Sequence, residues 1–113
     1  PNILYEFITS DWALAQVNSS SLLGVYGTKV KETAELLIKH NLVQFIGSDC
    51  HSMGKRYPSL MEGLSHINKI NGNSRYFLEN NNKIIDDKDI NIIEPKKVYS
   101  KYFINNVMSL LTL

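Results

Sequence analysis

Hydrophobic residues at helical spacing mark two amphipathic segments in the first forty positions. Over residues 2–9, apolar side chains recur every three or four positions, and Asp11 then interrupts the pattern. In the second segment, Thr28–His40, four apolar residues share one helical face: Val30, Ala34, Leu37 and Ile38. Charged residues occupy the other faces of that segment, as in a helix that packs on one side only. We therefore predict the end of a helix over residues 2–9 and a full amphipathic helix over Thr28–His40.

Two short apolar runs lack helical spacing and predict β-strands. The first is Ala13–Val17, and the second is the nearly continuous run Leu42–Gly47. A continuous run of this length is typical of a parallel strand whose two faces are both covered by helices. The polar segment 18–21, which is Asn followed by three Ser, reads as a loop after the first strand. Because strands alternate with helices, we expect βα units with parallel strands.

The second half of the chain predicts three further helices. Ser59 and Glu62 have the spacing of a capping box, so one helix should begin near Ser59. A second, short helix is capped by Asn73 or Ser74 and runs through three apolar residues: Tyr76, Phe77 and Leu78. A last helix should follow Pro95, with four residues on its apolar face: Tyr99, Phe103, Val107 and Leu110.

Two polar runs, Asn80–Asn82 and Asp86–Asp89, predict solvated turns, because such clusters punctuate periodic segments. They are too short to divide domains. We therefore treat residues 1–113 as a single domain.

The predicted strand pair cannot close a barrel or cover itself, so the fold class is α/β and the order of elements suggests the last part of a larger α/β barrel. The chain begins at Pro1 without an initiator Met, and we expect a partial domain. Without preceding strands, the edge of Ala13–Val17 and one face of Leu42–Gly47 would lack partners, which predicts self-association. Active sites of such barrels lie at the carboxyl ends of the strands, here Asn18–Ser21 and Ser48–His51.

The amino-acid composition argues against several classes of protein, including membrane proteins and nucleic-acid-binding proteins. The 113 residues are 43% hydrophobic and 20% charged, as in an ordinary globular domain. No apolar stretch approaches the roughly 20 residues of a bilayer span, so we expect no membrane insertion. Twelve basic and eleven acidic residues are scattered, which does not favour a nucleic-acid partner. The single cysteine, Cys50, cannot form an internal disulfide, which favours a reducing compartment such as the cytoplasm.

Candidate chemistry gathers directly after the second apolar run. In an extended segment Asp49 and His51 would point the same way, and a carboxylate with an imidazole suits Zn, Mn or Fe. The alternative is that Asp49 caps a turn and His51 is an ordinary loop histidine. Cys50 is rejected as a nucleophile because alternation points it away from Asp49 and His51 and a Gly-rich phosphate loop is missing. His40 and His66 are interpreted as structural or solvated.

Three segments together resemble a known family: Gln16–Gly24, Leu42–His51 and Arg56–Pro58. They are similar to the C-terminal part of the PHP-type (polymerase and histidinol phosphatase) tyrosine phosphatases, which are encoded in bacterial capsule and exopolysaccharide loci. The resemblance covers about residues 1–89. It implies a distorted α/β barrel of the PHP type, of which this chain is the C-terminal fragment with two parallel strands and several helices.

The resemblance also implies an activity and a set of site residues. The family uses divalent metals, usually Mn²⁺ with Zn²⁺, Fe²⁺ or Co²⁺ as alternatives, to hydrolyse phosphotyrosine on a partner autokinase. Asp49 and His51 match the family's last two metal ligands, and Arg56 matches a basic residue near the substrate phosphate. Asn18 and Ser20 are expected on the same rim without an assigned role.

Departures from the family pattern affect what the chain can do alone. Cys50 stands where Ala is usual and Tyr57 where Pro is frequent, and neither changes a ligand. The family's upstream His-x-His pair and its intervening Glu and His ligands do not occur here, so the fragment alone is expected to be inactive. Two alternatives stay open: another PHP phosphoesterase that acts on a small phosphate or nucleotide, and a noncatalytic fragment that self-associates.

Overall fold

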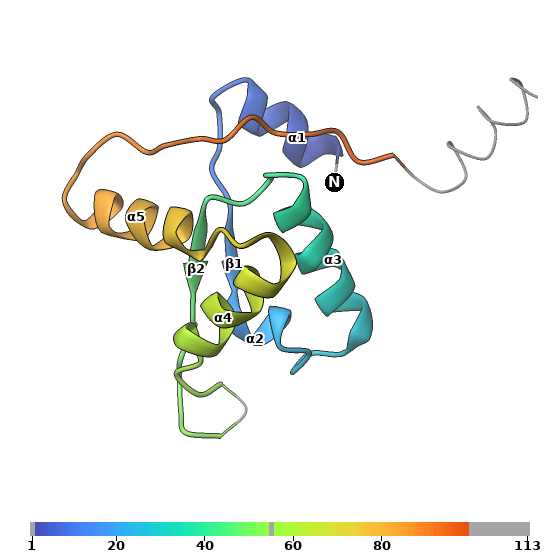
Figure 1. Cartoon of the computed structure of the whole chain (residues 1–113), viewed down its shortest axis with the longest axis vertical. Helices are drawn as coiled ribbons and strands as arrows, with labels where there is room; N and C mark the ends of the chain where they lie inside the picture. The colour runs from blue at the N-terminus through green and yellow to red at the C-terminus, as the bar shows by residue number, and fades with distance from the viewer. Residues whose placement is uncertain (1, 55, 100–113) are drawn as a thin grey trace, which may run out of the picture.

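The computed structural model describes residues 2–54 and 56–99. Within them the elements follow one another in this order: α1 (Asn2–Thr9), β1 (Gln16–Asn18), α2 (Ser19–Leu22), α3 (Thr28–Lys39), β2 (Phe45–Gly47), α4 (Leu60–Asn71) and α5 (Ser74–Ile85). The two strands lie side by side, and the long loop after β2 extends from their carboxyl ends (Figure 1). This arrangement confirms the predicted alternation of strands with helices.

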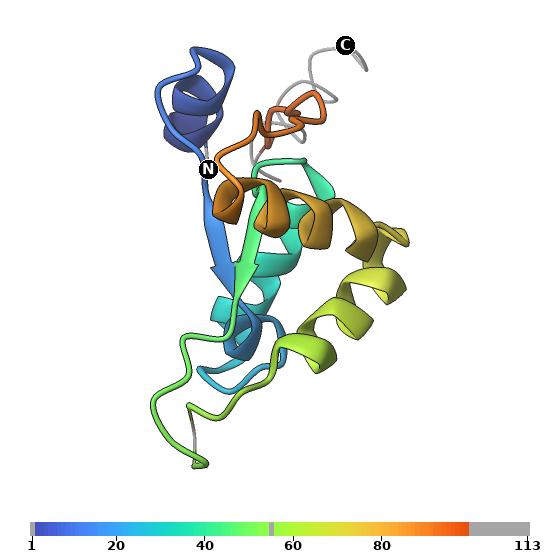
Figure 2. The same cartoon turned by 90° about the vertical axis from the view of Figure 1, so that its left-hand side faces the viewer.

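The sheet consists of β1 and β2, which pair in parallel with Val17 opposite Ile46. Both arrows point the same way in Figure 2, where α5 passes in front of the strands and α4 lies to their right. The parallel pairing is as predicted, but both strands are shorter than the apolar runs. The backbone N–H groups of Gln44 and Phe45 both donate to Ala15 O, at 2.9 and 3.1 Å. These bonds join the two strand segments at the start of their pairing.

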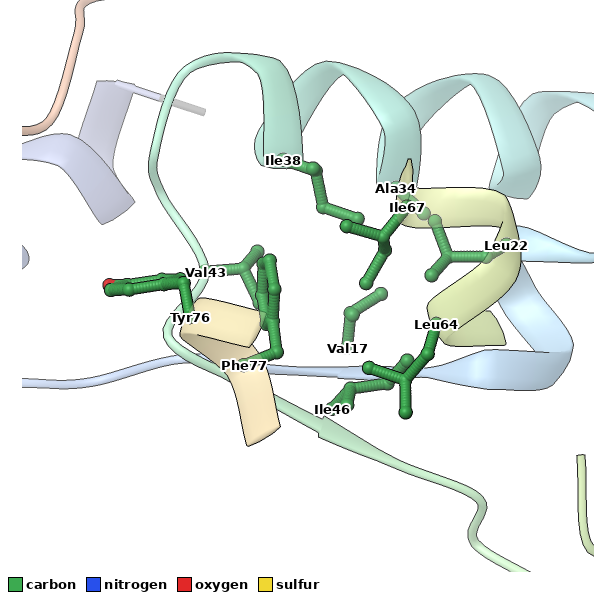
Figure 3. Close-up of a cluster of buried hydrophobic side chains, with 10 residues drawn as sticks. All are labelled: Val17, Leu22, Ala34, Ile38, Val43, Ile46, Leu64, Ile67, Tyr76 and Phe77. Atoms are coloured by element: carbon green, nitrogen blue, oxygen red, sulfur yellow. The ribbon is translucent and has the colours of Figure 1, made fainter. Parts of the chain in front are cut away.

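The core forms where the helices meet the strand pair (Figure 3). Its buried members come from every element except α1: Val17, Leu22, Ala34, Ile38, Val43, Ile46, Leu64, Ile67, Tyr76 and Phe77. The rings of Tyr76 and Phe77 meet edge to face, with centroids 5.2 Å apart. Ala34 and Ile38 confirm the predicted packing face of α3, whereas Val30 on the same stripe is 40% exposed.

The predicted loop at residues 18–21 is wrong. Ser19 begins the single helical turn α2, and Ser19 and Ser20 are buried. Ser19 Oγ lies 2.6 Å from Ser59 Oγ, so the buried hydroxyls satisfy each other. Ser59 precedes α4 as predicted, but its side chain forms no capping hydrogen bond to that helix. The predicted start of α4 is therefore confirmed, but the predicted capping box is not. Ser59 instead forms a hydrogen bond with Ser19 that links α4 to α2.

The predicted turn at Asn80–Asn82 is also wrong, because α5 continues through these residues to Ile85. Asn80 is fully buried, and its amide is paired with backbone groups rather than with solvent. The second predicted turn, Asp86–Asp89, is confirmed: it is exposed, and Asp87 adopts a left-handed φ of 53°.

The expectation that both apolar runs lack partners is wrong for Leu42–Gly47, but it agrees with β1, whose outer edge pairs with no strand within residues 2–54 and 56–99. Residues 42–46 are buried, because α4 and α5 pack on β2, so that run does not lack a covering layer. Beside β1 and α3 lies a groove of about 490 Å³, and Val30 is one of its lining residues. Self-association through this region stays a prediction.

The helix predicted after Pro95 is not observed over residues 96–99, which form neither a helix nor a strand. This segment crosses α3 and α1 instead: Lys96 N donates to His40 O at 2.8 Å, and Val98 N donates to Asn2 Oδ1 at 3.3 Å. Its path beside α1 is visible in Figure 1. The remaining residues of the predicted helix, Phe103, Val107 and Leu110, lie outside the described residues. Among the helices that the structure describes, none has the length and hydropathy to cross a bilayer.

Candidate functional site

Three of the predicted site residues meet in the loop that follows β2. Arg56 Nη2 lies 2.5 Å from Asp49 Oδ2, and His51 Nδ1 lies 3.7 Å from Asp49 Oδ1. The side chains of Asp49, His51 and Arg56 are 40%, 56% and 42% exposed, so solvent and a ligand can reach all three. The structure therefore brings a carboxylate, an imidazole and a guanidinium together at the carboxyl end of the strand.

The backbone brings these side chains together by a turn rather than by an extended strand. Asp49 adopts a left-handed φ of 50°, a conformation that Asp tolerates better than most residues. The loop then closes on itself, because the N–H groups of His51 and Ser52 both donate to Arg56 O, at 2.9 and 3.3 Å. The alternation argument for Asp49 and His51 is thus wrong in its geometry, although their side chains still converge.

The His51 ring is oriented by a hydrogen bond to the main chain. Its Nδ1 lies 2.8 Å from Asp49 O, and a carbonyl oxygen can only accept, so Nδ1 carries the proton and donates. Neutral imidazole then presents an unprotonated Nε2. A metal-ligating histidine typically donates its other ring nitrogen to a carbonyl or carboxylate in this way. The hydrogen bond therefore fixes the ring and leaves Nε2 as the nitrogen with a lone pair.

The Asp49 carboxylate has one engaged oxygen and one that faces His51. Oδ2 accepts from Arg56 and, at 3.5 Å, from Nδ2 of Asn18. Asn18 ends β1, so this contact joins the carboxyl ends of the two strands and places Asn18 on the rim as expected. Ser20 is not on the rim, because it is buried against Ser59.

The donor set fits part of a metal site. A carboxylate oxygen and an imidazole nitrogen are ligands that Mn, Zn and Fe accept. Within residues 2–54 and 56–99, no cluster of three or more His, Cys, Asp or Glu side chains is arranged to hold an ion. Asp49 and His51 can therefore supply two ligands, while Arg56 supplies a cation suited to a phosphate group.

The other chemically reactive side chains have different surroundings. Cys50 is exposed, and its Sγ lies 3.8 Å from Ser52 O. His66 Nε2 lies 2.8 Å from Glu35 Oε1, which joins α4 to α3. His40 Nδ1 lies 2.8 Å from Leu36 O at the end of α3. Both histidines are therefore structural, as predicted.

Comparison with known proteins shows that this chain is similar to proteins named as tyrosine-protein phosphatases. The putative tyrosine-protein phosphatase CapC of Staphylococcus aureus is 36% identical over 69 residues, which are 61% of this chain and 26% of the relative. The tyrosine-protein phosphatase YwqE of Bacillus subtilis (strain 168) is 30% identical over 86 residues, which are 75% of this chain and 34% of the relative.

The fold is similar to that of a chain from the crystal structures of YwqE from Bacillus subtilis and CpsB from Streptococcus pneumoniae, metal-dependent tyrosine phosphatases. The TM-score is 0.82 at 27% identity, and the match covers 88% of this chain and 41% of that chain. The chain therefore spans between 26% and 41% of the length of these relatives. The family model described as "Capsular polysaccharide synthesis, CpsB/CapC" matches residues 4–86, and the chain belongs to that family.

Proposed function

We propose that this chain is the C-terminal part of a metal-dependent tyrosine-protein phosphatase of capsular polysaccharide synthesis, built on a distorted PHP-type barrel. The names of its relatives and the similarity to metal-dependent tyrosine phosphatases support this assignment. The observation that carries it is the cluster of Asp49, His51 and Arg56 at the carboxyl end of β2. We call this chain together with the remainder of the proposed enzyme the intact protein.

Asp49 and His51 are proposed as two of the metal ligands, through Oδ1 and Nε2. These are the two atoms that the loop leaves available, since Oδ2 is engaged by Arg56 and Nδ1 by Asp49 O. Mn²⁺ is the proposed resident ion, on the family resemblance and on a donor set that suits it. When bound, such ions supply positive charge and activated water for phosphate hydrolysis.

Arg56 is proposed to bind the phosphoryl group of the substrate. Its guanidinium already engages an anion, the Asp49 carboxylate, and its side chain is 42% exposed. A planar fork of N–H donors matches the geometry of phosphate oxygens. A donor in this position can stabilise the charge that develops during phosphoryl transfer.

The proposed substrate is phosphotyrosine on a partner autokinase in the cytoplasm. An exposed loop is accessible to a protein substrate, and His51 is 56% exposed. The leaving group is a phenolate, whose conjugate acid has a pKa of about 10, so a strong general acid is less necessary than charge stabilisation. The single cysteine supports a reducing compartment.

Replacing Arg56 with Ala in the intact protein should lower kcat/KM for a phosphotyrosine peptide by about 10²–10³-fold, because one donor to the transition state is lost. Bound Mn²⁺ should stay at the wild-type level, since the donors of Asp49 and His51 are unchanged. Steady-state kinetics and elemental analysis of the same samples measure the two effects. Arg56→Lys should recover part of the rate, because it keeps the charge without the planar fork.

The matched control is Cys50→Ser, which changes an exposed residue of the same loop. It should keep wild-type kinetics, because the proposed chemistry does not use the thiol. Loss of metal in Arg56→Ala would contradict the assignment of Arg56 as a phosphate contact. Loss of activity in Cys50→Ser, together with insensitivity to chelators, would restore the cysteine mechanism instead.

A further inference from the structure

Helix α5 lies along the side of β2 that β1 does not occupy, where a further strand would otherwise pair (Figures 1 and 2). Asn81 makes the contact at this edge: its Nδ2 donates to Ile46 O at 2.8 Å, and its Oδ1 accepts from Ile46 N at 3.3 Å. One side-chain amide thus pairs with both backbone polar groups of a single strand residue. A neighbouring strand would supply the same donor and acceptor.

The preceding residue, Asn80, extends this pairing to Gln44. Asn80 Nδ2 donates to Gln44 O at 3.2 Å and to Asn91 O at 2.9 Å, while Asn80 Oδ1 accepts from Asn91 N at 3.2 Å. Gln44 and Ile46 are alternate residues, so the backbone oxygens of both point to the same edge of the strand. The side chains of Asn80 and Asn81 therefore form a short row of backbone-like partners.

Burial makes these contacts energetically important. Asn80 and Gln44 are both 0% exposed, and an unpaired amide or carbonyl in such a place costs free energy. Apolar residues at the two Asn positions could fill the space, but they would leave Ile46 and Gln44 unpaired. The Gln44 side chain acts similarly toward β1, because its Oε1 accepts from Ala15 N at 2.9 Å. Side-chain amides thus fix the strand from both directions.

We infer that Asn80 and Asn81 are positioning residues that seal the outer edge of β2 and thereby hold the strand end that carries Asp49. Ile46 precedes Asp49 by only three positions, and the strand ends at Gly47. Fixing the backbone of Ile46 restricts where the left-handed turn at Asp49 begins. The effect on the site rests on the proposed function; the sealing of the edge does not.

Hydrogen exchange in the intact protein tests the sealing of the edge. Asn81→Ala should raise the exchange rate of the Ile46 amide by about tenfold or more, because its acceptor is removed. The matched control is Asn82→Ala, the same substitution at the next, exposed position of α5. It should leave the Ile46 amide as protected as in the wild type. Equal protection in Asn81→Ala and Asn82→Ala would overturn the inference.

A second variant, Asn81→Asp, keeps the test decisive if Asn81→Ala does not fold. Its carboxylate can still accept from Ile46 N but cannot donate to Ile46 O. Protection of the Ile46 amide should therefore be largely retained in Asn81→Asp. Loss of that protection to the level of an unfolded segment would show that the hydrogen bond from Ile46 N to the side-chain oxygen at position 81 does not protect the edge.

Calorimetric titration with Mn²⁺ tests the effect on the site. Asn81→Ala should weaken Mn²⁺ binding by about 10-fold, because a less restrained Ile46 backbone loosens the strand end that positions Asp49, and Asn82→Ala should not. Unchanged affinity in Asn81→Ala with a faster-exchanging Ile46 would overturn the positioning role. Failure of the proposed function is distinguishable, because the wild-type protein itself would then bind no Mn²⁺ through Asp49 and His51.

Discussion

Replacing Asp49 or His51 with Ala in the intact protein is expected to lower metal-dependent hydrolysis of phosphotyrosine peptides by about 10³-fold or more. Each substitution removes one of the two donor atoms that the loop after β2 leaves available. If Asp49 and His51 hold the ion as proposed, loss of either ligand would remove both the positive charge and the activated water that the ion would supply. The measurement is kcat/KM with added Mn²⁺, together with the metal content of each purified variant.

Two control variants, Cys50→Ser and His66→Ala, separate loss of the metal from loss of stability. Cys50 lies between the two proposed ligands in sequence, and Cys50→Ser should keep the wild-type rate. His66→Ala removes the contact with Glu35 between α4 and α3, so it can lower stability but should not remove the metal. Full Mn²⁺-dependent activity in Asp49→Ala, or activity that chelators do not affect, would contradict the metal assignment.

The substitution Gly63→Ala should destabilise the protein, although Ala is the better helix former. A Cβ at position 63 would lie 2.6 Å from Ser19 Cβ, 3.0 Å from Ile46 Cδ1 and 3.2 Å from Ser19 Cα. The atoms of Ser19 cannot rotate away, because they belong to or adjoin the backbone of α2. Overpacking costs up to about 3 kcal/mol and helix propensity returns about 1 kcal/mol. We expect the free energy of unfolding to fall by about 2 kcal/mol.

Urea denaturation of the intact protein measures this change. Ser65→Ala is the control, because it lies on the exposed side of the same helix and improves helix propensity without a new contact. It should keep or slightly raise the midpoint. A higher midpoint in Gly63→Ala would contradict the close packing of α4 against α2 and β2.

The alternation of strands and helices could be predicted because hydrophobic periodicity reports burial. The stripe on α3 predicted a packing face, and Ala34 and Ile38 are indeed buried. The continuous run before Gly47 predicted a strand covered by helices, and α4 and α5 cover it. Parallel pairing followed from the order of elements.

The buried polar residues could not be predicted, since their partners are distant in sequence. Ser19 and Ser59 are 40 positions apart, and Asn81 and Ile46 are 35 apart. Local propensity favours turns for such residues, so a loop and a solvated turn were expected. One signal was present: Asn80 and Asn81 stand four positions after Tyr76 and Phe77, on the face that α5 buries.

The proximity of the three candidate site residues was predictable, but the geometry of their loop was not. Asp49, His51 and Arg56 are close in sequence, so their proximity follows from a short loop. The left-handed φ at Asp49 and the ring hydrogen bond of His51 are properties of the folded loop, which alternation along a strand does not represent.

Anomalous diffraction at the Mn absorption edge, from crystals of the intact protein with Mn²⁺, tests the central claim most directly. We expect an anomalous peak about 2 Å from His51 Nε2 and from a carboxylate oxygen of Asp49, the usual length of such bonds. Arg56 should lie on the open side of that peak. A peak that neither Asp49 nor His51 contacts, or no peak in an enzyme that hydrolyses phosphotyrosine, would contradict it.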